Sequence, residues 1–148
     1  RAIMNASLLE ESGLRPLTLL VHPDMLRLQR EVEMLHASHS WPILSLGQNV
    51  GRAVVPLPER RRAAAAQHAL EDAVRSIDAP VILCADLAPL CDRSLHLDPL
   101  SLLLRVSIER TLVVAWPGRC QDATLSYALP EHAHYRTWPQ PAAGIFLL

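Results

Sequence analysis

Short aliphatic runs alternate along the chain with segments in which apolar residues recur every three or four positions. The runs cover residues 17–21, 43–46, 81–84 and 111–115. The last two contain no alternation of apolar with polar side chains, which is typical of strands buried on both faces of a sheet. Parallel neighbours need a crossover of a dozen or more residues, and residues 85–110 are long enough to supply one. The pattern predicts a parallel sheet with helical crossovers.

Helical spacing predicts helices over residues 2–12, 25–38, 59–77 and 98–107. Gly13 is suited to end the first helix, and Asp98 and Pro99 are suited to the N-cap and first turn of the last one. Residues 47–58 contain two prolines and are expected to form an irregular connection.

Beyond residue 115 the pattern is weaker. Trp116, Pro117 and Gly118 are interpreted as a turn that closes the preceding strand, and a short strand is expected over 124–128. Residues 130–148 form a Pro- and His-rich C-terminal tail, whose final apolar run, 145–148, is suited to an edge strand. The order of elements predicts one domain over 1–148, a three-layer α/β fold with a mainly parallel sheet and flanking helices.

Composition restricts the chemistry. The 148-residue chain has a formal net charge of −1, and all 14 of its Lys and Arg residues are arginine. No mechanism that requires a lysine amine can therefore operate from this chain alone. Three cysteines without a CxxC pair predict a cytoplasmic location, and no apolar run approaches the ~20 residues needed to span a membrane.

A series of residues between positions 81 and 135 resembles a known family in its order and spacing. The residues are Leu90, Asp92, Leu95, Asp98, Pro99, Leu100, Arg110, Thr111, Val113, Trp116, Gly118, Tyr127, Ala128, Pro130, His132 and Tyr135. The series resembles BrxF, the small P-loop protein of type 3 BREX (bacteriophage exclusion) systems. The resemblance implies a P-loop NTPase-like fold and partners among the other subunits of a phage-defence complex.

The resemblance also implies a phosphate-binding loop directly after the first strand. Such a loop needs glycines with open backbone N–H groups, a lysine that reaches the phosphates and a hydroxyl that holds Mg²⁺. The corresponding residues are His22, Pro23, Asp24, Met25, Leu26, Arg27, Leu28 and Gln29, which include none of these. Pro23 also removes a backbone donor. The sequence therefore predicts a degenerate phosphate loop.

Asp86 follows the strand at 81–84, where the family is expected to place a magnesium-binding aspartate and a catalytic glutamate. Only the aspartate has a counterpart here, because no glutamate is adjacent. The favoured interpretation is a pseudo-NTPase with no catalytic residues, no cofactor and no metal site, acting through partner binding. Its partner surface is expected on the apolar residues 100–104 or on the tail, and homo-oligomerisation fits the same role.

Three alternatives remain open. An active ATP-binding protein would use Arg27 or Arg30 in place of the lysine, with Asp86 on Mg²⁺. A nucleic-acid-binding module would use Arg60, Arg61 and Arg62 together with Arg52, because cations at the start of a helix oppose its dipole and call for an explanation. The third alternative is a structural subunit without a ligand.

Overall fold

The computed structural model describes residues 13–148, so the helix expected over 2–12 lies outside the described residues. Within that part, seven strands form one sheet, and its main path runs in the order β2-β3-β4-β1-β7. These strands are β1 (Leu17–His22), β2 (Ile43–Ser45), β3 (Val81–Ala85), β4 (Thr111–Gln121) and β7 (Gly144–Leu147). All pairs along the path are parallel; Leu19, for example, lies between Val114 and Ile145. The predicted mainly parallel sheet is confirmed.

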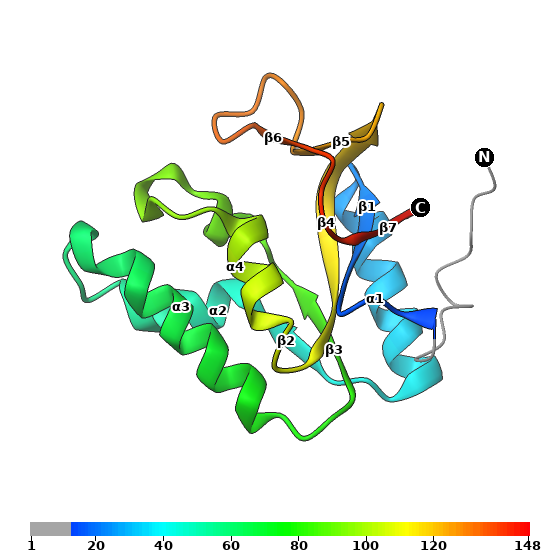
Figure 1. The fold of residues 1–148 in the computed structure, drawn as a ribbon, viewed down its shortest axis with the longest axis horizontal. Coiled ribbons are helices and arrows are strands. Elements are labelled where there is room, and N and C mark those ends of the chain that lie inside the picture. The colour runs from blue at the N-terminus through cyan, green and yellow to red at the C-terminus, as the bar shows by residue number, and fades with distance from the viewer. Residues whose placement is uncertain (1–12) are drawn as a thin grey trace.

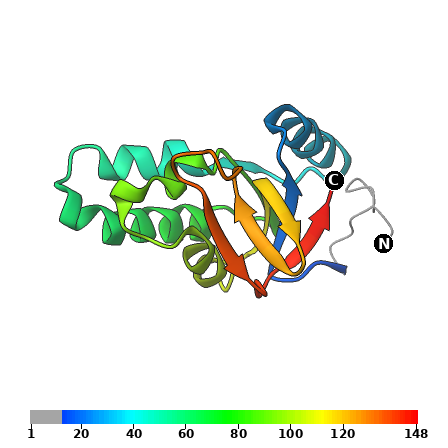
Figure 2. The same ribbon diagram turned by 90° about the horizontal axis from the view of Figure 1, so that it is seen from above.

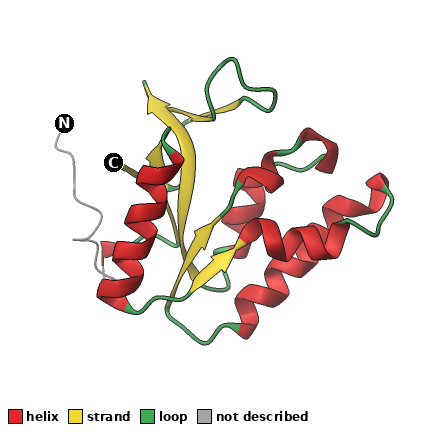
Figure 3. Cartoon of the chain, turned by 180° about the vertical axis from the view of Figure 1, so that it is seen from behind, coloured by secondary structure: helices red, strands yellow, loops and turns green. Residues whose placement is uncertain are grey.

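Helices cover both faces of the sheet. Helix α1 (Met25–His39) packs on one face, and α2 (Leu46–Val54), α3 (Glu59–Ser76) and α4 (Pro99–Val106) lie on the other (Figure 1). Seen from behind, α1 stands in front of the strands (Figure 3). Because successive strand residues point to opposite faces, Leu83 and Val113 belong to the smaller core beneath α1, whereas Ile82 and Val114 belong to the larger one. This three-layer arrangement is consistent with a P-loop-like fold.

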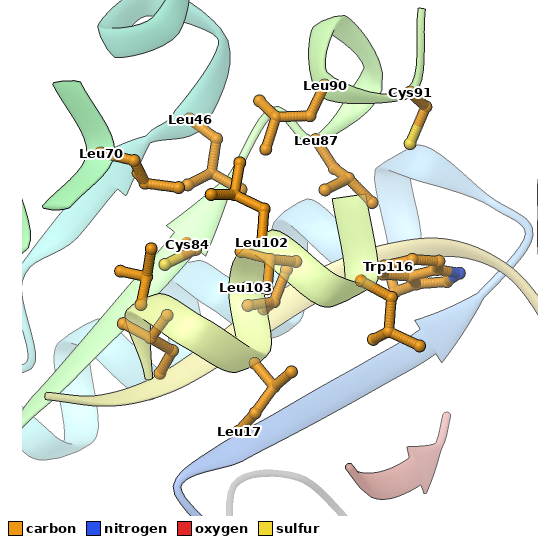
Figure 4. Close-up of a cluster of buried hydrophobic side chains, with 14 of the residues drawn as sticks. Leu17, Leu46, Leu70, Cys84, Leu87, Leu90, Cys91, Leu102, Leu103 and Trp116 are labelled. Carbon is orange, nitrogen blue, oxygen red and sulfur yellow. The ribbon is translucent and has the colours of Figure 1, made fainter. Parts of the chain in front are cut away.

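Helix α4 is buried against the sheet rather than available to a partner. Leu100, Leu102 and Leu103 are buried, and Leu104 packs against the same core, part of which Figure 4 shows. The expectation that residues 100–104 expose an apolar surface was therefore wrong, because all the leucines of this short helix face the interior. Asp98 caps the helix as predicted, since its Oδ1 accepts the Ser101 N–H at 3.1 Å.

Residues 46–54 form helix α2, where an irregular connection was expected over 47–58. Ser45 begins this helix by accepting the Gln48 N–H at 3.2 Å. Leu46, Val50 and Val54 recur every four residues and are buried. Gly47, expected to stop the preceding strand, lies in the first turn of α2. The apolar spacing was present in the sequence, but the prolines that weighed against it come only after the helix ends.

Strand β4 continues through the Trp116–Gly118 segment, so the expected turn there was wrong. It pairs with β5 (Thr124–Tyr127), which pairs with β6 (Arg136–Pro139), both antiparallel (Figure 2). Trp116 Nε1 donates to the Ser126 carbonyl at 2.9 Å. A Cβ at Gly118 would lie 1.9 Å from that same oxygen, so glycine is needed for the close approach. Residues 130–148 thus contain two strands rather than a tail alone, and the edge strand expected near 145–148 is confirmed as β7.

Candidate functional site

The carboxyl ends of β1, β2 and β3 lie at one edge of the sheet and carry His22, Ser45 and Asp86. Ligands of open α/β sheets bind at this edge, and the degenerate phosphate loop and Asp86 were both expected here. Between β3 and α4, two 3₁₀ segments, η3 (Ala88–Cys91) and η4 (Arg93–Leu95), continue from the same edge.

The start of α1 is occupied by groups of the chain itself. Only Pro23 and Asp24 separate β1 from α1. Asp24 Oδ1 accepts the Leu26 N–H at 2.9 Å, and His22 Nδ1 accepts the Asp24 N–H at 2.9 Å. In a phosphate-binding loop these donors would point at the ligand, and the positive end of the helix dipole would favour its charge. Here the Asp24 carboxylate takes that place, so a phosphate would meet a like charge.

Arg27 is committed to another partner. Its Nη1 donates to Glu31 Oε1 one turn along α1. Glu31 is only 2% exposed, and its Oε2 has no hydrogen-bond partner among the described residues. A buried carboxylate without its counter-ion is strongly unfavourable, so Arg27 stabilises α1 and is not free to replace a phosphate-loop lysine. Leu28 is buried beneath the helix, and Gln29 and Arg30 are exposed.

Asp86 lies against the start of α2. Its φ of 60° is in the left-handed region, which aspartate tolerates better than most residues. Asp86 Oδ2 accepts from Ser45 Oγ at 3.2 Å, and a Cβ at Gly47 would lie 2.2 Å from the same oxygen. The carboxylate therefore sits at the positive end of the α2 dipole. Across residues 13–148, no group of three His, Cys, Asp or Glu side chains is arranged to hold a metal ion.

A cavity of about 380 Å³ opens between α1, the end of β3 and the middle of β4. Eight of its eleven lining residues are apolar, and the other three are Gln29, Glu33 and Asp86. Met25 and Ile43 on its wall are 54% and 43% exposed, so they place apolar surface beside the cavity. This lining contains no cation, so it suits an apolar group rather than a nucleotide phosphate.

The three arginines at the start of α3, Arg60, Arg61 and Arg62, do not line this cavity. Arg60 and Arg61 are exposed, and Arg62 Nε donates to the Leu57 carbonyl at 3.0 Å. The chain brings further basic residues to the same end of the molecule: Arg93, His96 and Arg136 line a shallow hollow of about 590 Å³ together with Leu97 and Asp98. Sequence reasoning missed these three basic residues, because Arg136 is about 40 positions from the other two and the three share no motif.

The remaining titratable candidates are structural. Burial raises the pKa of both the Cys84 and Cys91 thiols to about 12, so neither is a nucleophile at neutral pH. His132 Nδ1 accepts the His134 N–H at 3.0 Å, a contact that shapes the loop before β6. No helix within residues 13–148 combines the length and the apolar character needed to cross a membrane.

The fold and the edge geometry define a class: an α/β protein with a mainly parallel, helix-flanked sheet, in which side chains of the chain itself lie at the starts of α1 and α2. Comparisons with protein-family models, with curated proteins and with solved structures found no match to this chain.

Proposed function

We propose that this chain is a catalytically degenerate, P-loop-like protein that acts by binding protein partners in a bacterial phage-defence complex of the BREX type. The assignment to that system rests on the resemblance of residues 81–135 to BrxF, and the proposed cytoplasmic location rests on the three cysteines without a CxxC pair. Its role there is to be a subunit, not an ATPase.

The observation that carries the proposal is the Asp24 carboxylate at the start of α1. It accepts the Leu26 N–H at 2.9 Å, a donor that a phosphate would otherwise use. Three further features also disfavour nucleotide binding. They are the two-residue connection from β1, the pairing of Arg27 with buried Glu31, and the position of Asp86 against α2. Each removes a different requirement of nucleotide binding, so restoring one would not restore the site.

Partner binding is supported by the apolar cavity beside α1. Met25 and Ile43 expose apolar surface at its mouth, and Leu26 is 63% exposed on the neighbouring position of the helix. Apolar side chains that cluster around a cavity are typical of interaction sites. A scaffold that keeps the ligand-facing edge of the sheet but lines it with Met and Ile is suited to hold a protein side chain.

The decisive experiment is a titration of the purified protein with Mg·ATP and with a non-hydrolysable analogue, following heat of binding and melting temperature together. We expect no heat and no thermal shift at millimolar nucleotide. Hydrolysis of ATP above the rate of an Asp86→Ala variant would refute the proposal.

A second experiment tests the partner role directly. The chain is co-purified with the other subunits of a type 3 BREX complex, and Met25→Asp is expected to weaken the association. Ile108→Asp is the matched control, because Ile108 is 81% exposed but does not line the cavity. Equal behaviour of both variants would contradict a role for the cavity.

A further inference from the structure

Three segments that are distant in sequence meet at one end of the molecule and bring basic side chains together. His96 Nε2 lies 3.2 Å from Glu59 Oε1 at the start of α3. Arg93 Nη2 donates to the Tyr135 carbonyl at 3.2 Å, and Arg136 Nη1 donates to the Leu97 carbonyl at 3.0 Å. The start of α3, residues 93–98 and the start of β6 are therefore joined by direct contacts.

The basic residues that this end presents are Arg60, Arg61, Arg93, His96 and Arg136, which we call the arginine end. Two of these arginines belong to α3, and the other three residues line the hollow of about 590 Å³. Among the described residues, Arg60 and Arg61 make no ion pair and no side-chain hydrogen bond, and both are exposed. Their guanidinium groups are available to an external anion.

The nearby acids are largely occupied by donors of the chain. Asp98 accepts the Ser101 N–H and the Trp138 Nε1–H at 3.1 Å each, and lies 3.8 Å from Arg136. Asp92 Oδ1 accepts the Ser94 N–H at 2.9 Å, and this hydrogen bond lowers the pKa of the Asp92 carboxyl. Glu59 faces His96. The carboxylates thus fix the segments in place, while the two α3 arginines remain unneutralised.

We propose that the arginine end binds the phosphodiester backbone of a nucleic acid. Guanidinium groups pair with phosphate oxygens through two parallel N–H donors. Helix α3 has 18 residues and begins at Pro58, which has no side-chain cap, so its dipole adds to the attraction. Cations on separate elements fit a chain of phosphates better than a single ion, and none of the residues at the arginine end lines the apolar cavity.

This site goes beyond partner binding, since it shares no residue with the cavity beside α1 and its ligand differs in chemistry. Contacts to phosphates carry no sequence information, so the binding is independent of base sequence. Four arginines on a single strand correspond to a slope of about −3 in the logarithm of the binding constant against the logarithm of salt concentration.

The test uses fluorescence anisotropy of a labelled 20-nucleotide single strand and a 20-base-pair duplex at 50 and 200 mM salt. We expect binding that weakens with salt, and a slope reduced by about half in the double variant Arg60→Gln/Arg61→Gln. Arg93→Gln is expected to weaken binding further. The matched control is Arg30→Gln/Arg119→Gln, which removes the same charge from exposed arginines on α1 and β4; we expect it to bind like the unaltered protein.

Three results would overturn the assignment. One is the absence of binding at 50 mM salt with about 100 µM protein, a concentration that equals the weakest dissociation constants of ordinary non-specific binding at physiological salt. Another is an equal loss in the α3 double variant and in the control, which would indicate diffuse charge. The third is competition by inorganic phosphate or dAMP as effective as that of the oligonucleotide, because the site would then take one free phosphate. None of these depends on whether ATP binds at α1, so the two proposals fail separately.

Discussion

Gly47 and Gly51 lie one turn apart on helix α2. The surroundings of each predict opposite effects on stability when the glycine is replaced by alanine. A Cβ at Gly47 would lie 2.2 Å from Asp86 Oδ2, 2.7 Å from Asp86 Cγ and 2.8 Å from Pro89 Cγ. A Cβ at Gly51 would have no atom within 4 Å. Gly47→Ala therefore tests whether the Asp86 carboxylate lies against the start of α2.

The magnitude follows from two terms. Alanine stabilises a helix interior by about 1 kcal/mol relative to glycine, and this gain applies at both positions. At Gly47 the new methyl overlaps a carboxylate and a proline ring, and overpacking of this kind costs about 1–3 kcal/mol or somewhat more. We expect Gly51→Ala to raise the free energy of unfolding by about 1 kcal/mol, and Gly47→Ala to lower it by up to about 2 kcal/mol.

The assay is urea unfolding of the unaltered protein and both variants, followed by circular dichroism. A double-mutant cycle with Asp86→Gly separates the carboxylate from the proline, because glycine accepts the left-handed φ of 60° at this position. The loss caused by Gly47→Ala should shrink in the Asp86→Gly background and keep only the part due to Pro89.

If Gly47→Ala proved as stable as Gly51→Ala, the carboxylate would not occupy this place. Asp86 would then be free to point elsewhere, including toward a metal ion at the sheet edge, and the argument for a degenerate site would lose one of its supports. A coupling energy near zero in the cycle would have the same meaning.

Two further experiments test the contacts that hold the arginine end together and the burial of the core cysteines. Asp98→Ala removes the cap of α4 and the acceptor of Trp138 Nε1. In urea unfolding it should lower the free energy of unfolding by about 2 kcal/mol. The control is Asp72→Ala, at a side chain that is 77% exposed, which should change the free energy of unfolding by less than about 0.5 kcal/mol. Iodoacetamide at pH 8 should spare Cys84 and Cys91, since burial raises the pKa of both to about 12 and keeps the thiols protonated, and mass spectrometry should find Cys120 labelled first. Labelling of Cys84 at the rate seen in urea would contradict that burial.

The sequence was sufficient for the elements whose pattern is local and long. The spacing in 59–77 and the apolar runs of β1, β3 and β4 identify their elements, because burial imposes the periodicity directly. Helix α2 was missed because the two prolines of residues 47–58 favoured an irregular connection, although both lie beyond the end of the helix. The cap at Ser45 and the burial of Val50 and Val54 stabilise it. The extension of β4 was missed because Pro117 and Gly118 usually end a strand, whereas here Gly118 admits the close approach of β5.

For the candidate site, the absence of a lysine and of loop glycines was visible in the sequence, but what fills their place was not. That Asp24 caps α1, that Arg27 pairs with Glu31 and that Asp86 reaches Ser45 all depend on side-chain positions. The last of these joins residues 41 positions apart. Long-range contacts of this kind follow from strand order, which a single sequence does not specify.

The capping of the helices explains why the two proposed surfaces lie where they do. Helices α1 and α4 begin at Asp24 and Asp98, and α2 begins at Ser45 with the Asp86 carboxylate beside it. A carboxylate therefore neutralises the positive end of each of these three dipoles, including both at the carboxyl edge of the sheet. Helix α3 begins differently.

Pro58 offers α3 no cap, and three arginines follow within the first turn, with Glu59 as the acid among them. Positive charge at a positive helix end is unfavourable in the isolated protein, and a bound polyanion would relieve it. At the start of α1 the Asp24 carboxylate thus takes a donor that would attract a phosphate, whereas positive charge accumulates at the start of α3. The two proposed surfaces, the apolar cavity for a protein partner and the arginine end for a nucleic-acid backbone, account for both distributions of charge.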